Sequence, residues 1–326
     1  MTKDVGRYLD AERRLWDHVG VAPIERRVTL ASGGQVRVQE VGEGNPFVLI
    51  HGGSIAGTSW ATLAAALEGV RCLLVDRPGC GLSEPIVGGP LRDLRSVEAY
   101  ADLLLRDLLD ALELDTAAVG ATSYGGFFAF RGAAAAPERV TKIMEYSWPI
   151  GAPSDGAPLT ARMGAVPGLQ LLMTRLPMTR GMVKRALRQF GLGRAIDSGA
   201  FDDHMLDWAH ALLHDTDTLA NDVRSSPDVF TPIRGQNLEL LFTDDLLAKV
   251  TMPVLFLWGE NDPNGGAEVA RNFARRLPNA EIVIVPGGEH APWLDDLDTC
   301  ASHTRSFLVD RLPTPRTNDR PRSPGP

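Results

Sequence analysis

The chain has 326 residues, of which 44% are apolar and 23% charged, and its formal net charge is −8. This composition is ordinary for a folded globular enzyme and argues against a disordered chain, while the negative charge disfavours a nucleic-acid partner. The length suits one large domain that carries an insertion, or two modest domains.

No targeting or redox pattern stands out in the sequence. The N-terminus lacks the apolar core of a signal peptide. The most apolar window, residues 117–136, contains Arg131 and several glycines, so it is interpreted as a buried strand and helix, not a membrane span. The three cysteines (Cys72, Cys80 and Cys300) are widely spaced and offer neither a disulfide framework nor a zinc pattern. We therefore expect a cytoplasmic protein with no membrane partner.

The N-terminal residues 1–21 predict an amphipathic helix whose apolar positions are Val5, Leu9, Trp16 and Val19. An antiparallel hairpin is predicted next, because residues 25–30 and 35–41 alternate in polarity and Ser32-Gly33-Gly34 supplies the turn. Strands and helices then alternate along the chain. This alternation predicts right-handed βαβ units, and hence a mostly parallel sheet with helices on both faces.

A buried strand at residues 47–50 leads directly into His51-Gly52-Gly53-Ser54. Glycine lets the backbone approach a bound molecule closely. The N–H of Gly53, or alternatively of Ser54, is therefore a candidate donor to a negatively charged oxygen. We expect His51 to brace this loop through hydrogen bonds and not to act in catalysis.

The next strand, residues 71–75, runs into the Gly- and Pro-rich residues 76–83, which are interpreted as a structural loop. A helix is predicted over residues 96–114, with an apolar stripe formed by Val97, Tyr100, Leu104, Leu108 and Leu112.

A serine stands at the bend between a short apolar strand, residues 116–121, and a following helix. Such a strand–turn–helix holds the serine in a strained, positive-φ conformation that exposes its hydroxyl. The close approach of strand and helix requires small residues, which Ala121, Gly125 and Gly126 supply. The stretch is a near match to G-x-S-x-G, with alanine at the first glycine, and it marks Ser123 as a nucleophile.

The neighbouring Thr122 is the poorer nucleophile, because that register would place bulky Tyr124 where the second glycine must sit. Tyr124 is the first residue of the predicted helix. Its backbone N–H is therefore the second candidate donor to an oxyanion.

Two later strands, residues 254–258 and 281–286, end in loops that carry Asp262 and His290. Both strands are apolar on both sides, as in parallel strands covered by helices. Their loops leave the carboxyl edge of the sheet, where open α/β sheets place their sites. A serine needs an imidazole to accept its proton, and the imidazole needs a carboxylate to fix its tautomer. Glu145, near the end of a strand predicted at 140–146, is the alternative carboxylate.

Together these segments resemble the α/β-hydrolase superfamily from about residue 24 to residue 308, without the middle third. Four matches in chain order carry the resemblance, and they are His51-Gly52-Gly53, residues 76–83, Ser123-Tyr124-Gly125-Gly126, and Asp262 with His290. The resemblance implies an α/β-hydrolase fold, in which a mostly parallel sheet has an N-terminal antiparallel hairpin, helices on both faces and an inserted helical cap. A serine at position 123 argues against the family members that use an aspartate nucleophile.

Residues 148–249 interrupt the strand–helix alternation and are interpreted as helices broken by Gly and Pro, resembling a cap over the nucleophile. Basic residues dominate 162–194 and acidic residues dominate 197–245. This pattern predicts oppositely charged helices that attract each other; the alternative is a basic rim that attracts an anionic substrate such as a coenzyme-A thioester. One helix face collects Asp203, Asp207, His210 and His214. It lacks the glutamate of the zinc motif, so no metal is predicted.

The predicted domain organisation is an N-terminal helix (1–21), a hydrolase core (22–147 and 250–311), a cap (148–249) and a tail (312–326). The core ends in a helix over residues 293–310. The tail lacks apolar residues and is expected to be disordered.

The predicted function is a serine hydrolase that uses Ser123, His290 and Asp262 to cleave an ester, lactone or thioester of a small, mainly apolar substrate. The N–H groups of Gly53 and Tyr124 would form the oxyanion hole. No cofactor is expected, because the donors and the triad complete the chemistry. Two alternatives stay open: hydrolytic C–C bond cleavage of a dicarbonyl substrate, and a non-catalytic receptor role on the same fold. The sequence leaves the oligomeric state open.

Substrate contacts are expected from Ser54, Trp60 and Trp148, which lie near strand ends, and from an apolar wall of the cap. The expected wall residues are Met163, Met173, Met178, Met182, Met205, Leu169, Leu172, Leu176 and Phe190. Because methionine is flexible and polarizable, such a wall predicts a preference for medium-sized apolar acyl groups over acetate.

Overall fold

The architecture was obtained as a computed structural model, which describes residues 3–309 except 90, 92, 155, 157–161, 163–164, 167–177, 226–229 and 232–234. The predicted tail, residues 312–326, lies outside the described residues, as do Met163, Met173, Leu169, Leu172 and Leu176 of the expected cap wall.

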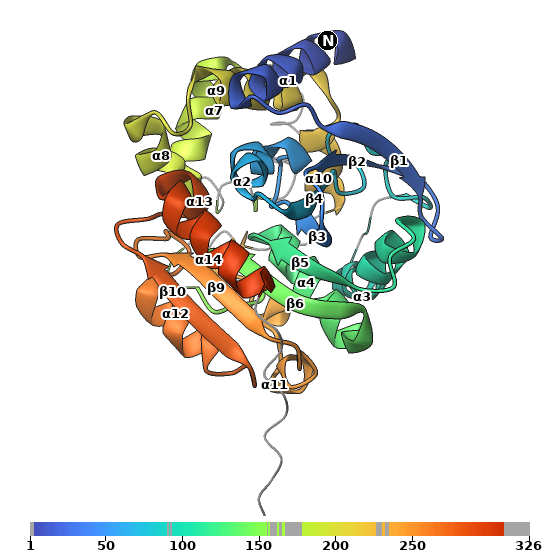
Figure 1. Ribbon diagram of the computed structural model, residues 1–326, viewed down its shortest axis with the longest axis vertical. Coiled ribbons are helices and arrows are strands. Elements are labelled where there is room, and N and C mark those ends of the chain that lie inside the picture. Colours follow the sequence, from blue (N-terminus) through green and yellow to red (C-terminus); the bar gives the residue numbers. More distant parts are fainter. Residues whose placement is uncertain are drawn as a thin grey trace, which may run out of the picture.

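A central eight-stranded sheet organises the molecule (Figure 1). Its strand order is β1-β2-β4-β3-β5-β6-β9-β10. The strands are β1 (Ile24–Thr29), β2 (Gln35–Val41), β3 (Asn45–Ile50), β4 (Val70–Val75), β5 (Ala117–Ala121), β6 (Val140–Tyr146), β9 (Val254–Gly259) and β10 (Ala280–Val285). Strand β2 runs antiparallel to both β1 and β4, and all other pairs are parallel. The predicted mostly parallel sheet with an N-terminal hairpin is confirmed.

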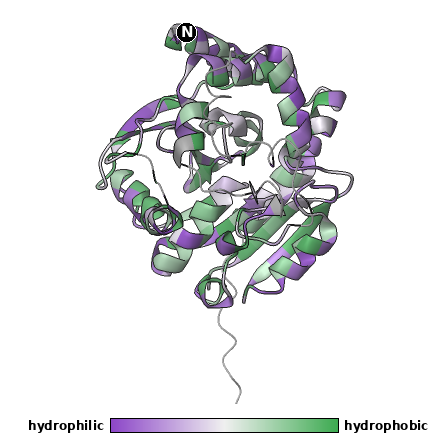
Figure 2. Cartoon of the chain, turned by 180° about the vertical axis from the view of Figure 1, so that it is seen from behind, coloured by the Kyte–Doolittle hydropathy of each residue, from purple (hydrophilic) through white to green (hydrophobic). Residues whose placement is uncertain are grey.

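Alternate residues of the central strands enter two separate apolar clusters, one on each face of the sheet. In β3, Val48 and Ile50 pack on one face, whereas Phe47 and Leu49 pack on the other. The first face is covered by α3 (Leu94–Ala111), α4 (Tyr124–Ala135), α11 (Asp244–Leu247) and α12 (Ala267–Ala274). The second face is covered by α1 (Val5–Val19), α2 (Ala61–Ala66), α13 (Pro292–Asp295) and α14 (Leu297–Val309). Figure 2 shows the mixed polarity of these surrounding helices.

Short 3-10 helices complete the core, at η1 (Gly57–Trp60), η2 (Pro137–Arg139) and η4 (Leu238–Leu240). The prediction of a single helix over residues 293–310 is wrong in one respect. The structure divides it into α13 and α14, because Asp296 between them has φ −151° and ψ 83°. Within the described residues, no helix is both long and apolar enough to span a membrane.

Helix α1 buries only part of the apolar face that was predicted, because Trp16 is buried but other predicted positions are not. Val5 and Leu9 are 45% and 41% exposed, whereas Tyr8 and Leu15 are fully buried. The hydroxyl of Tyr8 donates to Glu12 at 2.8 Å, and Arg37 of β2 donates to the same carboxylate at 2.6 and 3.0 Å. Tyr8, Ala11 and Leu15 form a buried stripe at helical spacing, and the Glu12–Arg37 ion pair lies on the same face of α1.

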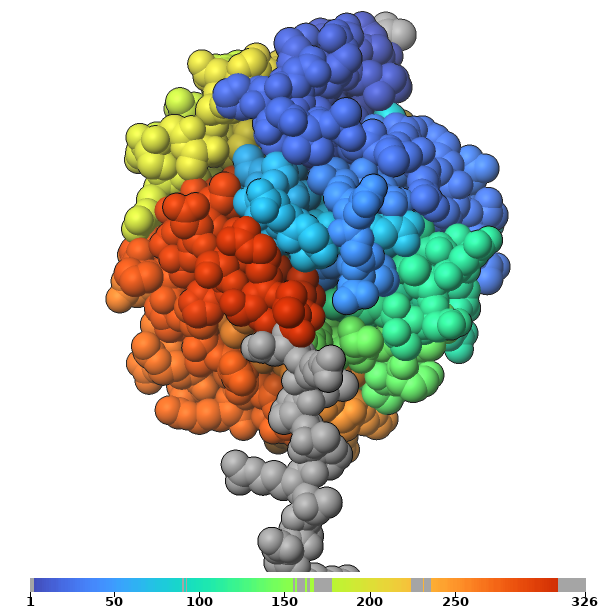
Figure 3. Space-filling model, viewed as in Figure 1, coloured from blue at the N-terminus to red at the C-terminus, as the bar shows by residue number. Residues whose placement is uncertain are grey.

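The segment between β6 and β9, here termed the inserted segment, carries the predicted helices. They are α7 (Arg180–Leu187), the π-helical turn η3 (Arg188–Leu192), α8 (Gly193–Ser198), α9 (Asp203–Asp215) and α10 (Thr218–Ser225). A small ribbon of β7 (Phe230–Thr231) and β8 (Gly235–Gln236) follows. Helix α1 lies against α9, and Figure 3 shows the N-terminal residues beside the inserted segment on one surface.

The charge pattern of the inserted segment resolves into ion pairs between its helices. Arg180 of α7 pairs with Asp203 and Asp207 of α9, at 2.5 and 2.6 Å, and Arg188 pairs with Asp197. These contacts are exposed, so solvent screens the charges and each pair contributes little to stability. They match the interpretation of oppositely charged helices that attract each other.

Candidate active site

The strand–turn–helix at Ser123 has the geometry that its sequence predicts. Ser123 follows β5, precedes α4 and has φ 55° and ψ −117°, a conformation that L-residues rarely adopt. Glycine is required at position 125, because a Cβ there would lie 2.2 Å from the carbonyl oxygen of Ile50. The helix therefore approaches β3 closely enough to hold Ser123 above the carboxyl edge of the sheet.

Glu145 lies beneath this bend in a fully buried position. A Cβ at Gly126 would approach its two carboxyl oxygens to 2.7 and 2.8 Å, so the second glycine makes room for this side chain. Neither oxygen has a well-formed hydrogen bond within the described part of the chain. Burial raises the pKa of the Glu145 carboxyl well above its usual value; the backbone N–H of Ser123 opposes this rise, and the charge of Asp262 adds to it. Burial therefore favours the neutral form of the Glu145 carboxyl in the folded protein.

This buried acid makes stability depend on pH. The unfolded chain releases the Glu145 proton above about pH 4.3, whereas the folded protein keeps it, so this group lowers the unfolding free energy as pH rises. Glu145→Gln removes the titration. We expect its unfolding free energy, relative to the wild type, to increase by up to about 1.4 kcal/mol per pH unit above pH 5. Urea unfolding at pH 5.5, 7 and 8.5 measures this difference.

Glu12→Gln is the matched control, because Glu12 is equally buried but is bonded to Arg37. That variant is expected to be less stable at all three pH values, since it removes the nearest of the three carboxylates that surround the buried Arg37 guanidinium. If the unfolding free energy of Glu145→Gln relative to the wild type stayed constant or fell as pH rises, Glu145 would not be protonated in the folded protein.

His290 and Asp262 are joined directly at the ends of β9 and β10. Nδ1 of His290 lies 2.8 Å from Oδ2 of Asp262. Three further donors surround this buried carboxylate: the backbone N–H of Trp148 at 3.1 Å, and the backbone N–H and side-chain amide of Asn264 at 2.9 and 3.2 Å. These donors compensate for the burial of the charge and fix its orientation. The histidine then carries its proton on Nδ1, which leaves Nε2 as the base.

A chain of hydroxyl groups links the nucleophile bend to this pair. Thr122 Oγ1 lies 3.1 Å from Ser147 Oγ, which lies 3.3 Å from Nδ1 of His290. Ser123 and His290 themselves share no hydrogen bond among the described residues. Catalytic hydrogen bonds are often long before substrate binds, so this geometry is compatible with a serine–histidine pair.

The loop formed by residues 51–54 lies beside Ser123. A Cβ at Gly52 would be 3.2 Å from Cβ of Ser123. His51 braces the loop as predicted: its Nε2 accepts the Arg77 backbone N–H at 2.9 Å, and its Nδ1 lies 2.8 Å from the Gly52 carbonyl oxygen. Burial lowers the pKa of His51 well below its usual value, and the charge of Arg77 acts in the same direction. The imidazole is therefore neutral and structural.

Arg77 is a functional candidate that sequence reasoning missed. Its guanidinium donates to the carbonyl oxygens of His51 and Gly52, at 3.1 and 2.8 Å, and to Oδ1 of Asp222 at 2.9 Å. It also lies 4.7 Å from the centre of the Tyr124 ring. The Gly/Pro turn after β4 is a structural loop, as interpreted, but its arginine supports the loop beside Ser123.

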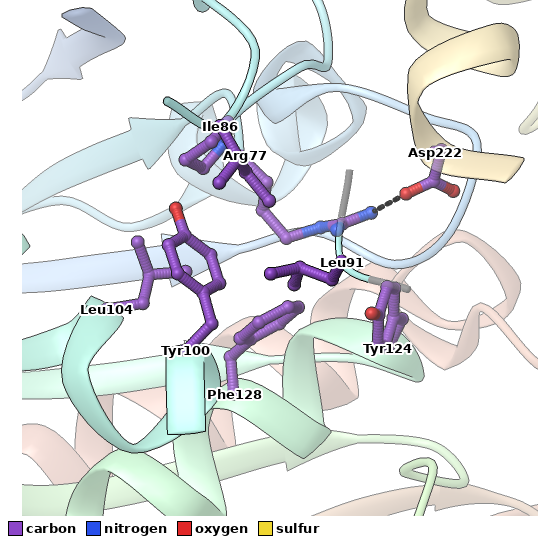
Figure 4. A pocket seen from close by; sticks show the side chains of 9 residues that line it. Arg77, Ile86, Leu91, Tyr100, Leu104, Tyr124, Phe128 and Asp222 are labelled. Atoms are coloured by element: carbon purple, nitrogen blue, oxygen red, sulfur yellow. Dashed lines mark hydrogen bonds and ion pairs between the residues drawn. The ribbon is translucent and has the colours of Figure 1, made fainter. Parts of the chain in front are cut away.

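A cavity opens next to this arginine. It is lined by Arg77, Asp222 and a set of mainly apolar side chains: Pro78, Ile86, Leu91, Tyr100, Leu104, Tyr124 and Phe128. Figure 4 shows the Arg77–Asp222 ion pair at its edge and the rings of Tyr100, Tyr124 and Phe128 around it. Tyr124 directly follows Ser123 in the sequence, but Ser123 itself is not among the residues that line this cavity.

The residues expected to contact substrate lie elsewhere or have other partners. Trp60 is completely buried and packs against Trp293 and Tyr146, with ring centres 4.4 and 5.2 Å apart. Core packing thus leaves it no surface for a substrate, and this expectation is corrected. Trp148 is 1% exposed and orients Asp262 through its backbone N–H. The Ser54 hydroxyl lies 3.2 Å from Oδ2 of Asp222.

The described part of the expected cap wall does not form one surface. Met182 and Phe190 are 44% and 40% exposed, whereas Met205 is buried. The polar face of α9 is also occupied. Asp203 and Asp207 bind Arg180, and His210 lies 2.8 Å from the carbonyl oxygen of Met178. Among the residues described, no cluster of three or more His, Cys, Asp and Glu could hold a metal ion.

The inserted segment contacts the histidine loop directly. The carbonyl oxygen of Gly191 accepts the backbone N–H of His290 at 2.9 Å. Gly191 has φ 82°, and a Cβ there would come within 2.7 Å of both His290 and Pro263. Only glycine fits this approach. The inserted segment thus reaches the loops of both the acid and the base.

Comparison with known proteins agrees with this geometry. Residues 47–303 match the model of the alpha/beta hydrolase family, so the chain belongs to that family. A 2-hydroxy-6-oxononadienedioate/2-hydroxy-6-oxononatrienedioate hydrolase of Cupriavidus pinatubonensis is 29% identical over 83% of this chain and 91% of its own length. A pimeloyl-[acyl-carrier protein] methyl ester esterase of Vibrio parahaemolyticus is 26% identical over 83% of this chain and 97% of its own.

Solved structures show the same fold. The carboxylesterase CesB of Bacillus subtilis has a TM-score of 0.73 at 19% identity, and the alignment covers 94% of this chain and 99% of that one. A 2-hydroxy-6-oxo-6-phenylhexa-2,4-dienoate hydrolase of a Rhodococcus strain has a TM-score of 0.69 at 18% identity, covering 88% and 98% of the two chains.

Proposed function

We propose that this alpha/beta hydrolase is a serine hydrolase that cleaves an ester, lactone or thioester of a small, mainly apolar substrate. The observation that carries the proposal is the combination of Ser123 in a positive-φ bend after β5 with the hydrogen-bonded His290–Asp262 pair. A strained serine above the sheet edge and an oriented imidazole are the two parts that acyl transfer needs.

In the proposed mechanism, Oγ of Ser123 attacks the acyl carbon while Nε2 of His290 accepts the hydroxyl proton. The imidazolium, stabilised by Asp262, donates that proton to the leaving oxygen or sulfur as its bond to the acyl carbon breaks. A water then attacks the acyl-enzyme with His290 as base. The acid is released and Ser123 regains its proton. The two steps together consume only the substrate and one water molecule.

The oxyanion hole is assigned to the backbone N–H groups of Gly53 and Tyr124. Ser54, the other sequence candidate, is disfavoured because its N–H donates to Oδ2 of Asp222 at 2.5 Å. Gly53 makes no hydrogen bond through its N–H within the described residues, and Tyr124 begins the helix that follows the nucleophile. Both donors belong to segments that adjoin Ser123.

Residues 148–249 are proposed to act as a cap. The contacts of Gly191 with His290 and of Asp222 with Ser54 support this role, because they place the inserted segment against loops on both sides of the site. A cytoplasmic location is proposed from the three free, buried cysteines.

The proposed preference for a mainly apolar substrate predicts that activity rises with acyl length. We expect kcat/KM for p-nitrophenyl esters to increase from acetate to medium chains, by at most about 0.8 kcal/mol, or a few-fold, per buried methylene. Initial rates along a series from about two to ten carbons measure this dependence. A steady decline from acetate onward would mean that no apolar site receives the acyl group.

Hydrolytic C–C bond cleavage is the second candidate, supported by the names of several relatives. Those names describe dicarboxylate substrates, which need cationic partners in the site. The buried cation that the described residues place beside this site, Arg77, is already neutralised by Asp222 at 2.9 Å. This pairing favours an uncharged ester over a dianionic dienedioate.

A labelling and turnover experiment separates the candidates. The wild type is treated with a fluorophosphonate probe and assayed against aryl esters and against a chromogenic 2-hydroxy-6-oxo-dienedioate. Labelling with ester turnover supports the proposed hydrolase, and faster cleavage of the dienedioate would favour the C–C enzyme. Labelling without turnover of either would indicate a receptor on the same fold.

A further inference from the structure

Asp222 is a buried carboxylate of α10 that binds the loop beside the nucleophile. Its Oδ2 accepts the Ser54 backbone N–H at 2.5 Å and the Ser54 hydroxyl at 3.2 Å. Its Oδ1 accepts Nη2 of Arg77 at 2.9 Å and lies 3.8 Å from Sγ of Cys80. The side chain is 6% exposed, so these contacts are shielded from water. A residue of the inserted segment is thus joined to the loop of residues 51–54 by charge-assisted hydrogen bonds.

Asp222 and Arg77 hold opposite ends of the same loop. Asp222 binds the N–H of Ser54 at the end of the loop, and Arg77 binds the carbonyl oxygens of His51 and Gly52 at its beginning. The ion pair between the two side chains closes the arrangement. Gly53, the proposed oxyanion donor, lies between the two attachment points.

The loop needs such support because its backbone is strained. Ser54 has φ 52°, which is unfavourable for a residue with a side chain. Its N–H and hydroxyl both point to Asp222, so the carboxylate favours this conformation over relaxed ones. Oxyanion donors must be aimed before the reaction begins, and a small displacement costs much of their effect.

We propose that Asp222 is a positioning residue, which aims the Gly53 N–H at the oxyanion by fastening Ser54 and Arg77 from the inserted segment. The inference rests on the proposed serine-hydrolase function. It makes the oxyanion hole dependent on the docking of α10, so that the site is complete only when this helix is seated on the loop.

The expected result for Asp222→Ala is a kcat about 10- to 100-fold below the wild type, with KM within about threefold. The hole acts on the oxyanion and not on the bound ester, so the loss falls on the chemical step. The rate of fluorophosphonate labelling should fall by a similar factor, because the phosphonyl oxygen occupies the same hole. The kcat and labelling rate of Asp222→Asn should lie between those of the wild type and Asp222→Ala. The amide oxygen of Asn can still accept from Ser54, but its NH2 group would face the Arg77 guanidinium.

Asn221→Ala is the matched control on the same helix. The Asn221 side chain donates to the carbonyl oxygen of Gly79 at 3.0 Å and so docks α10 without touching the loop. We expect its kcat and labelling rate to stay within about threefold of the wild type. An equal loss in Asn221→Ala and Asp222→Ala would reduce Asp222 to a docking residue and overturn the proposal.

A double variant separates positioning from stability. Asp222→Ala leaves Arg77 buried without a charge partner, which lowers the melting temperature. Arg77→Met combined with Asp222→Ala removes that charge, although it also removes the hydrogen bonds from Arg77 to the His51 and Gly52 carbonyl oxygens, so the melting temperature should recover in part while kcat and labelling stay low. Recovery of activity together with stability would overturn the positioning role. A wild type that the probe fails to label would overturn the serine-hydrolase function itself, whereas equal labelling of the wild type and Asp222→Ala would overturn this inference alone.

Discussion

Ser123→Ala is expected to lower kcat/KM by three or more orders of magnitude while the fold remains intact. The side chain supplies the only atom that forms the proposed acyl-enzyme, and the residual rate would come from the oxyanion donors and substrate binding. The alanine also keeps a side chain at φ 55°, so the strained bend is not replaced by a relaxed one. Ester turnover with the best aryl ester, measured beside the circular dichroism spectrum and melting temperature, tests this result.

The neighbouring hydroxyl groups provide controls. The hydroxyl oxygens of Thr122 and Ser147 are 3.1 Å apart, and that of Ser147 lies 3.3 Å from Nδ1 of His290. Thr122→Val and Ser147→Ala are expected to change kcat/KM by at most about tenfold, because neither hydroxyl is presented at the exposed bend. Near-normal activity of a folded Ser123→Ala, together with a large loss in either control, would transfer the nucleophile to that residue.

Local sequence was sufficient to predict the parts of the site that lie within one strand and its following loop. The bend at Ser123 depends on the small residues Gly125 and Gly126. A Cβ added at Gly125 would clash with β3, and one added at Gly126 would clash with Glu145. Asp262 and His290 follow apolar strands that pair in parallel register, so their loops necessarily meet at one edge of the sheet. The sheet itself was predictable for the same reason.

Contacts between distant segments could not be predicted from one sequence. Ser54 and Asp222 are 168 positions apart, and nothing in the composition of α10 distinguishes Asp222 from the other acids around it. The buried face of α1 was missed in part, because Tyr8 and Leu15 face the core beside the Glu12–Arg37 ion pair whereas Val5 and Leu9 are exposed. Trp60 was misplaced because a large aromatic near a strand end suits a core as well as a pocket. In each case contacts with distant residues determine whether a side chain is buried or lies at the site, and the local sequence pattern does not specify those contacts.

Asp262→Asn is expected to lower kcat/KM by about 10³- to 10⁴-fold. The four donors around the carboxylate explain why an isosteric amide fails. If the amide oxygen accepts from Asn264, which offers two N–H groups, the NH2 group must face the Trp148 N–H and His290. An amide donor toward Nδ1 moves the imidazole proton to Nε2, where it can no longer accept the serine proton. The variant also loses the charge that stabilises the imidazolium during the reaction.

Glu145→Gln tests the alternative assignment, in which Glu145 and not Asp262 is the acid that orients His290. Glu145 is the second carboxyl group near the bend, but it is buried beneath α4, where burial favours its neutral form, and it makes no contact with His290 among the described residues. We expect this variant to keep kcat/KM within about threefold of the wild type at pH 7 while gaining stability with rising pH. An inactive Glu145→Gln beside an active Asp262→Asn would instead make Glu145 the acid, and the orienting carboxylate would follow β6 and not β9. The pairing of Asp262 with His290 at 2.8 Å is the reason to expect the opposite.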